Sequence, residues 1–223
     1  MNLHQRSLQI LENTTVQDLR IEEVGQEVDA IKGIVSDHCA RKRLFLSALE
    51  QAERPVINEL SVRCVKAFNP LQLLGELKRD PYLAGVTFSL GQSLRYQSTF
   101  HVTCFTGSAG EITLNGRVPS KAYRAYLETK LWLAAGISRV INLTSSATIN
   151  EPEPNAAEVL RKLIETEAKL DSNISAAISA KAEKQILHLQ GHVGSHALLQ
   201  ELEHDAWAIP MVLDVQNEVR VVH

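Results

Sequence analysis

The sequence predicts an α+β fold made of tandem small two-layer α/β sandwiches, each with the element order α-β-β-α-β. Two observations carry this prediction. Residues 189–217 repeat residues 114–142 without a gap, with ten identities in 29 positions. In both copies, apolar residues first alternate as in a strand and then recur at helical spacing. A constant offset held across both patterns marks a duplicated structural unit.

Both copies begin with Leu-x-Gly-x-Val-x-Ser, end with Val-x-Asn and share a tryptophan, Trp132 or Trp207. A glycine inside a strand lets a helix or a neighbouring backbone approach closely. The tryptophan lies next to the apolar stripe of the helix, where its large ring is expected to seal the edge of a small core. The shared residues therefore explain a fold rather than a chemistry.

A degenerate first copy is predicted over residues 1–64, where residues 31–35 are similar to the Leu-x-Gly-x-Val stretch. One residue is missing from its last loop, and Asp29 stands at a core-facing position that Ile112 takes in the second copy. Its expected elements are a helix over residues 2–13, strands around 19–21 and 31–35 with a turn at 24–26, a helix through Ala40, Leu44 and Ala48, and a strand over 56–60.

The second unit is predicted over residues 65–150. Asn69 and Pro70 open its first helix, since proline is favoured in a first helical turn. Residues 80–110 form an insertion that only this unit has. Alternating apolar residues at 86–90 and 98–105 predict an added or lengthened hairpin there.

The third unit is predicted over residues 151–223, after a linker with two prolines in a polar run. Asn155 and Ser195 are expected to cap its two helices. Strands are expected over residues 174–180 and 187–193, with a turn at 182–185, and a final strand over 212–222.

Charge is shared unevenly among the three units: the net charge is −2 in the first, +5 in the second and −6 in the third. A basic middle unit favours an anionic partner or contact between units. The three cysteines show no Cys-x-x-Cys and are expected to be reduced core residues. The sequence as given has no signal-peptide pattern and no apolar stretch of about 18 residues. We therefore expect a cytoplasmic protein, or a peripheral membrane or periplasmic one if the sequence is a fragment.

These patterns resemble the BON domain family, whose bacterial members combine a Leu-x-Gly-x-Val strand, a helix and a closing Val-x-Asn strand. The matching stretches are residues 114–118 with 140–142 and residues 189–193 with 215–217, and more loosely 31–35 with 56–58. Three tandem BON-like units would cover nearly the whole chain.

The resemblance implies a fold without catalytic residues and a role in binding phospholipid membranes or envelope components, or in protein assembly. By topology alone, the fold is also similar to the ring-building modules of bacterial secretion systems. The expected partners are therefore an anionic phospholipid or cell-envelope component, with self-association or a protein partner as the alternative. We expect no nucleic acid partner.

The outward face of the predicted sheets is the candidate binding surface, because its polar and basic side chains suit phosphate head groups. Arg117 with its neighbours Lys121 and Arg124 is the leading group. The predicted binding residues are Lys32, Asn115, Arg117, Lys121, Arg124, His188 and His192.

A metal site is not expected, although His188, His192, His196 and His204 invite one. On a strand, His188 and His192 share a face but stand roughly 13 Å apart at about 3.3 Å per residue, too far for one ion. Cys39 has no partner at a spacing typical of a nucleophile. The sequence also lacks a phosphate loop, a dinucleotide fingerprint and a serine elbow, so we expect neither an enzyme nor a cofactor.

Overall fold

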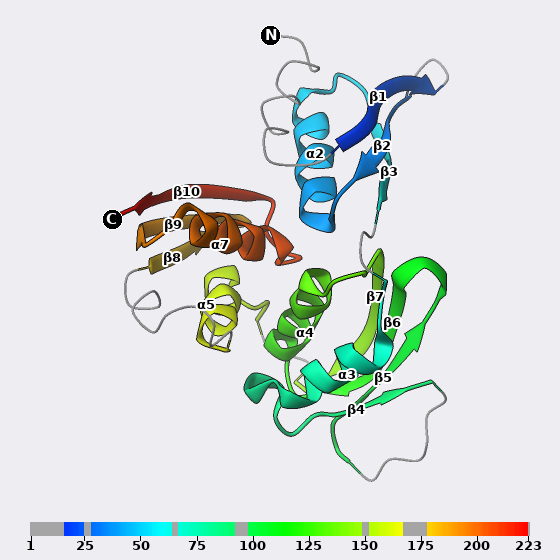
Figure 1. Ribbon diagram of the computed structural model, residues 1–223, viewed down its shortest axis with the longest axis vertical. Helices are drawn as coiled ribbons and strands as arrows, with labels where there is room; N and C mark the ends of the chain where they lie inside the picture. The colour runs from blue at the N-terminus through cyan, green and yellow to red at the C-terminus, as the bar shows by residue number, and fades with distance from the viewer. Residues whose placement is uncertain are drawn as a thin grey trace. The chain divides into compact units, whose positions relative to one another are not determined.

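The computed structural model describes residues 16–24, 28–63, 67–91, 98–148, 152–166 and 178–222. These residues divide into two compact units, Met1–Ala67 and Phe68–His223 (Figure 1). The predicted mixed α+β fold is confirmed, because three separate small sheets each pack against helices. Among the described residues, no helix combines the length and the apolar composition needed to cross a membrane.

The N-terminal unit contains a three-stranded sheet in the order β1-β2-β3 and one described helix. Strand β2 pairs antiparallel with β1 and parallel with β3. One side of α2 packs Ala40, Leu44 and Ala48 onto the sheet, as predicted. The predicted helix over residues 2–13 lies outside the described residues, as do residues 25 and 26 of the predicted turn. The described elements are β1 (Val16–Val24), β2 (Val28–Val35), α2 (His38–Gln51) and β3 (Val56–Val62).

The first half of the second unit contains a four-stranded sheet in the order β4-β5-β6-β7, called the middle sheet below. Asn69 caps α3 by accepting the backbone N–H groups of Leu71 and Gln72, and Ser120 caps α4 in the same way through Tyr123. Its elements are α3 (Pro70–Arg79), η2 (Pro81–Leu83), β4 (Thr87–Leu90), β5 (His101–Thr106), η3 (Ser108–Gly110), β6 (Glu111–Val118), α4 (Lys121–Leu133) and β7 (Arg139–Ser146).

The hairpin predicted in the insertion is wrong, because β4 and β5 run parallel. The N–H of Thr87 donates to the carbonyl of Phe100, and the N–H of Gly91 donates to that of Cys104. Parallel neighbours need a connection that returns the chain to the same end of the sheet, which a tight turn cannot provide. The alternation of apolar residues predicted both strands but carries no information about their relative direction.

The second half of this unit contains a three-stranded sheet in the order β10-β9-β8, called the C-terminal sheet below. The predicted caps are confirmed: Asn155 Oδ1 accepts the N–H of Ala157, and Ser195 Oγ accepts that of Leu198. Residues 174–177 of the predicted strand lie outside the described part of the chain. The elements are α5 (Ala156–Thr166), β8 (Ile178–Glu183), β9 (Ile186–Val193), α7 (His196–Ala208) and β10 (Asp214–Val221).

The strand registers of the three sheets follow the predicted repeat. Residues 28 positions apart pair in the parallel ladders of the middle sheet (Ile112 with Val140) and of the C-terminal sheet (Leu187 with Val215). In the N-terminal unit, the separation falls to 27, with Asp29 opposite Val56. This difference is the single residue missing from the degenerate copy.

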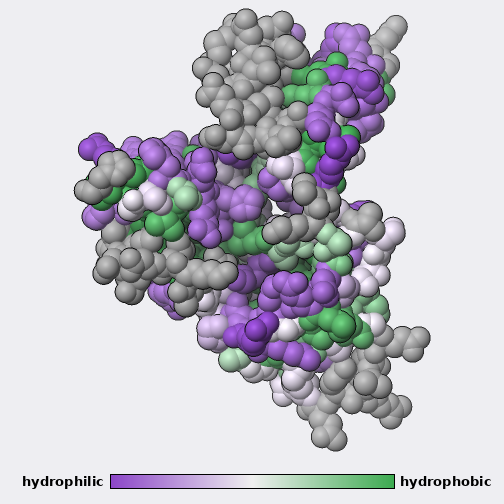
Figure 2. Space-filling view, in the orientation of Figure 1, coloured by the Kyte–Doolittle hydropathy of each residue, from purple (hydrophilic) through white to green (hydrophobic). Residues whose placement is uncertain are grey.

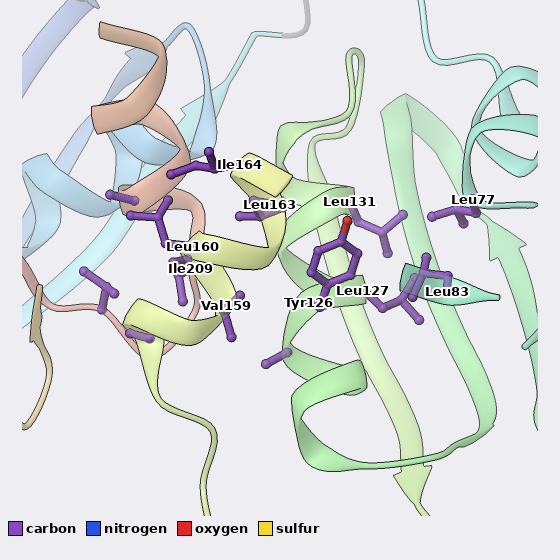
Figure 3. Packing of buried hydrophobic residues seen from close by; sticks show 14 of the residues in the cluster. Leu77, Leu83, Tyr126, Leu127, Leu131, Val159, Leu160, Leu163, Ile164 and Ile209 are labelled. Carbon is purple, nitrogen blue, oxygen red and sulfur yellow. The ribbon is translucent and has the colours of Figure 1, made fainter. Parts of the chain in front are cut away.

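The middle and C-terminal sheets share one hydrophobic core, in which α4 and α5 meet. Figure 3 shows Leu160 and Leu163 of α5 and Tyr126 and Leu131 of α4 within this cluster. The Tyr126 hydroxyl donates to Asp80 Oδ2 at 2.8 Å and lies 2.6 Å from Thr166 Oγ1. The predicted units 65–150 and 151–223 are therefore packed together within the second compact unit.

The two tryptophans lie where the repeat predicts. Trp207 is buried, and Trp132 is half-buried against the hydrophobic core of the second compact unit. The prediction that they belong to the core or its edge is confirmed. They are consequently poor candidates for membrane anchors.

Candidate functional site

The outer face of the middle sheet is the surface opposite α3 and α4. The alternate residues Ile112, Leu114 and Val118 of β6 point into the core and are buried. Their neighbours therefore point outward, because successive side chains of a strand lie on opposite faces. The outward residues are Thr87 and Ser89 of β4, His101, Thr103 and Phe105 of β5, Glu111, Thr113, Asn115 and Arg117 of β6, and Arg139, Ile141, Leu143 and Ser145 of β7.

The strand registers arrange these outward residues in rows across the sheet. Phe105, Thr113 and Ile141 form one row. Thr103, Asn115 and Leu143 form the next, and His101, Arg117 and Ser145 the third. Leu143 is 61% exposed and Phe105 39% exposed. Apolar side chains therefore lie in solvent within two rows of an arginine.

The charge on this face is positive. Arg117 is exposed and makes no ion pair with any described residue. Glu111 is the one acidic residue at the outward positions given above, and its carboxylate lies 3.7 Å from Arg139. Arg117 is therefore a cation on a face where the one outward carboxylate already contacts Arg139.

A hydroxyl network surrounds His101 on the same face. Its Nδ1 lies 2.7 Å from Thr87 Oγ1, and its Nε2 lies 3.1 Å from both Ser89 Oγ and Thr103 Oγ1. Burial lowers the pKa of His101, so the ring is neutral near pH 7. The Thr87 hydroxyl donates to the carbonyl of Phe100, and Thr87 Oγ1 is therefore positioned to accept from Nδ1–H.

Sequence reasoning did not select His101. The residue sits in the inserted part of the middle unit, and no spacing motif links it to Thr87 or Ser89, which lie on another strand. Only the parallel pairing of β4 with β5 brings these side chains together. The alternation of β5 placed His101 on the outward face and was the one available signal.

The structure does not gather the predicted basic residues on one surface. Lys121 and Arg124 belong to α4, in the helix layer, whereas Arg117 points away from that layer. Lys121 Nζ lies 2.8 Å from Glu153 Oε1, and Arg124 Nη2 donates to the carbonyl of Asn142 at 3.0 Å. Asn115, by contrast, lies beside Arg117 on the outer face. The anionic-surface role of all these residues stays a prediction.

Lys32 lies on the outer face of the N-terminal sheet between two carboxylates. Its Nζ is 2.8 Å from Glu22 and 3.1 Å from Glu59, and Arg20 also contacts Glu22 at 2.8 Å. Hydrogen bonds to Glu22 and Glu59 raise the pKa of Lys32, and the bond from Lys32 lowers the pKa of Glu22. The positive charge of Lys32 is thus balanced locally.

His188 and His192 both point outward from β9, opposite the buried Leu187 and Leu189, as predicted. The surrounding outer face of the C-terminal sheet is polar and of mixed charge. Gln190 donates to Glu218 at 2.9 Å, and Lys181 pairs with Glu183. A hydrogen bond from Lys181, followed by the charges of Lys181 and His188, lowers the pKa of Glu183.

The two outer faces differ most at the apolar positions of the middle sheet. Equivalent registers place Lys181 where the middle sheet has Phe105, Gln216 where it has Ile141, and Glu218 where it has Leu143. At these three positions, the middle sheet thus carries apolar side chains where the C-terminal sheet carries polar or charged ones.

The helix layer offers a weaker candidate surface. Figure 2 shows mostly hydrophilic surface over α7 and an apolar area beside α3. Leu71 of α3 is 73% exposed. Isolated exposed apolar side chains are common on soluble proteins and do not mark a site.

The C-terminal segment, with its Leu-x-Gly-x-Val strand β9, helix α7 and Val-x-Asn strand β10, is now defined in structure. Residues 153–223 match the BON domain family. The described elements within the matched segment are α5, β8, β9, α7 and β10. The prediction of a BON resemblance is confirmed for this third unit. That the first two units are also BON-like stays a prediction.

The solved structures that resemble this chain include two that match weakly. Both are structures of CdsD, described as a structural protein of the type III secretion system of Chlamydia trachomatis. One has a TM-score of 0.24 and covers 98% of the solved chain, and the other has a TM-score of 0.25 and covers 93%. Each is 11% identical over 100% of this chain. At such TM-scores these likenesses carry no argument about this protein. No curated protein matches the sequence.

Proposed function

We propose that this protein is a non-enzymatic binding protein that attaches to an anionic phospholipid membrane through the outer face of the middle sheet. One observation carries the proposal. Exposed Leu143 and Phe105, with Ile141 beside them, lie within two rows of Arg117 on a face whose one carboxylate at the outward positions is already paired. The BON match at residues 153–223 supports a binding role for the chain.

The chemistry of this face suits the interface of a bilayer. Apolar side chains gain free energy by leaving water among acyl chains, about 1.5–3 kcal/mol for a fully buried Leu or Phe. A basic residue near an anionic leaflet adds about 1 kcal/mol. Arginine also holds phosphate oxygens through two parallel hydrogen bonds. A patch of this size gives weak, reversible and salt-sensitive attachment.

Co-sedimentation with vesicles tests the proposal on the full chain. Vesicles of phosphatidylcholine alone are compared with vesicles that also contain phosphatidylglycerol, at low and high salt. We expect binding only to the anionic vesicles, and weaker binding at high salt. Equal sedimentation with both vesicle types at low salt would contradict the proposal.

Two variants with the same change of charge locate the binding surface. Leu143→Glu introduces the residue that the C-terminal sheet has at the equivalent position, Glu218, so the backbone is expected to accept it. Gln216→Glu adds one negative charge on the outer face of the C-terminal sheet, where Gln216 is exposed. We expect Leu143→Glu to abolish vesicle binding and Gln216→Glu to retain it. Equal loss in both variants would point to net charge rather than to this surface.

The exposed side chains of Phe105 and Leu143 also favour a second candidate function, protein assembly. A copy of this chain or a partner protein would cover Phe105 and Leu143 in the same way as a membrane. Size-exclusion chromatography with light scattering separates the two candidates. An oligomer that becomes monomeric in Leu143→Glu, together with absent vesicle binding in the unaltered protein, would favour assembly.

A further inference from the structure

The two sheets of the second compact unit differ at one edge. In the middle sheet, β4 lies beside β5 as a fourth strand. In the C-terminal sheet, β8 occupies the position of β5, and β8 is itself the edge strand. Among the described residues, a fourth strand is therefore present in the middle sheet and not in the C-terminal sheet.

The strand registers identify which residues of β8 correspond to those that β4 covers. Gly116 and Gly191 are equivalent glycines of the repeat, and they pair with Val102 and Ile178. Two residues further along, Cys104 of β5 corresponds to Ala180 of β8. In the middle sheet, Phe88 of β4 lies opposite Val102 and Leu90 lies opposite Cys104.

The inner side of β8 lacks the cover that these residues provide. Val102 is 0% and Cys104 1% exposed, whereas Ile178 and Ala180 are only half-buried. A pocket of about 380 Å³ opens between α5 and β8 at this point. Its lining residues are Asn155, Ala157, Glu158, Arg161, Ile164, Glu165, Ile178 and Ala180. The pocket therefore lies where side chains equivalent to Phe88 and Leu90 would enter.

The backbone of β8 also has the orientation needed to accept a strand. The carbonyl of Phe100 accepts a hydrogen bond from Thr87, the first residue of β4, and that of Cys104 accepts one from Gly91, which follows β4. Val102 and Cys104 therefore present their backbone groups to β4. Alternation along a strand places the backbone N–H and C=O groups of Ile178 and Ala180 toward the free edge of β8. Unpaired groups of this kind are a template for another strand.

In the closing strands β3, β7 and β10, an asparagine side chain binds a backbone N–H group of the same strand. The described residues of β8 have no such contact. In each sheet, an asparagine of the closing strand accepts a backbone N–H two residues further on: Asn58 from Leu60, Asn142 from Thr144 and Asn217 from Val219. Val222 and Ala147 donate inward to the neighbouring strand, so Val219 and Thr144 point to the open edge. The described residues of β8 include no asparagine and no side-chain contact of this type.

The connections that lead into β5 and β8 differ in length. Twenty-one residues, 80–100, separate the end of α3 at Arg79 from the start of β5 at His101. Eleven residues, 167–177, separate the end of α5 at Thr166 from the start of β8 at Ile178. The connection in the middle unit is thus ten residues longer, and it includes β4.

We propose that the free edge of β8 binds an extended segment of a partner protein as a fourth strand parallel to β8. Two apolar side chains of that segment, two residues apart, enter the pocket between α5 and β8, and the residue between them is polar. Strand addition of this type takes its affinity from backbone hydrogen bonds and its specificity from side-chain pockets. This site is separate from the outer face of the middle sheet, and either proposal stands without the other.

The segment that the pocket fits is described by β4 itself, Thr87-Phe88-Ser89-Leu90. A capped, fluorescently labelled peptide with the sequence of residues 85–91 is therefore the probe. Its binding to the full chain is measured by fluorescence anisotropy. We expect saturable binding, and loss of binding when the peptide residues that correspond to Phe88 and Leu90 are both replaced by aspartate. The absence of saturable binding would overturn the proposal.

Two variants of β8 separate the pocket from the rest of the strand. Ala180→Phe fills the pocket from its wall, and Ser179→Phe adds the same ring on the opposite face, one residue away. We expect Ala180→Phe to weaken peptide binding at least tenfold and Ser179→Phe to leave it unchanged. Thermal unfolding checks that both variants fold. Equal weakening by both would overturn the proposal.

Amide hydrogen exchange of the free chain decides which segment occupies the edge. We expect the amides of Ile178 and Ala180 to exchange rapidly alone and slowly with the peptide. Slow exchange in the free chain at every concentration would mean that the chain covers its own edge. Slow exchange that appears only at high concentration would mean that a second copy does. Either result would overturn the proposal of a partner segment.

Discussion

Asn142 Nδ2 donates a hydrogen bond to Glu128 Oε2 at 2.9 Å, while Asn142 Oδ1 accepts the backbone N–H of Thr144. The asparagine of the Val-x-Asn stretch thus connects α4 to a backbone N–H of β7 that points to the open edge of the sheet. Asn and Glu recur together as Glu203 and Asn217 in the third unit. The repeated asparagine is therefore explained by the sheet edge rather than by a binding role.

Replacing Asn142 tests this role. Asn142→Ala removes the bonds to Glu128 and Thr144, and we expect the free energy of unfolding to fall by about 1–2 kcal/mol. Asn142→Asp keeps the acceptor but places a second carboxylate beside Glu128, so we expect a larger loss at neutral pH. Urea unfolding at pH 7 measures both. An Asp variant as stable as the native protein would contradict the assigned contact.

Tyr126 is expected to stabilise the junction between α4, η2 and α5 through its hydroxyl. Tyr126→Phe removes the bonds to Asp80 and Thr166 and leaves the Asp80 carboxylate with fewer donors. A hydrogen bond to a charged group contributes about 1.5–3 kcal/mol, and we expect a loss of this size in urea unfolding. Tyr123→Phe is the matched control, because the Tyr123 ring stacks on Tyr82 while its hydroxyl makes no hydrogen bond with described residues. Equal effects of the two substitutions would refute this role.

The stability of the protein is expected to depend on pH through His101. Burial lowers the pKa of His101 in the folded state, whereas an unfolded histidine titrates near pH 6.5. The unfolded chain therefore binds more protons as the pH falls below about 6.5, and the contribution of His101 to the free energy of unfolding is lost there. Urea midpoints between about pH 7.5 and 5 should fall less in His101→Gln than in the native protein. Parallel curves for the two proteins would argue against this assignment.

Cys104 is expected to be inert while the protein is folded. Its thiol is 1% exposed, and burial raises its pKa to about 12. Since the thiolate is the reactive form, iodoacetamide at pH 8 should modify Cys104 only after unfolding in urea. Peptide mapping by mass spectrometry measures the modification. Because an unfolded thiol ionises near pH 8.5, stability should also decline as the pH rises above that value. Rapid modification of Cys104 in the native chain would show that β4 and α3 do not cover it.

Much of the fold follows from the sequence because local patterns and a fixed repeat agree. The caps at Asn155 and Ser195 depend on one side chain and its following backbone, and they formed as predicted. The direction of β4 did not follow, because alternation of Phe88 and Leu90 is the same in parallel and antiparallel pairs. That choice is made by the connection and by packing against α3.

The candidate site was only partly predictable. Alternation placed Asn115 and Arg117 on the outer face, because this property depends on one strand alone. The neighbours of Arg117 come from β5 and β7, and strand pairing rather than sequence distance brings His101 and Ser145 beside it. Lys121 and Arg124 are close to Arg117 in sequence, but the chain turns into the helix layer between them.

Because α4 and α5 share one core, the two halves of the second compact unit are packed together rather than joined by a flexible linker. Leu160 and Leu163 are 0% exposed in this core, so neither half can rotate freely without uncovering them. If the middle sheet lies on a bilayer, the shared core therefore fixes the orientation of the pocket between α5 and β8 relative to that bilayer. A partner segment bound in this pocket would be held at a constant height and angle above the lipid.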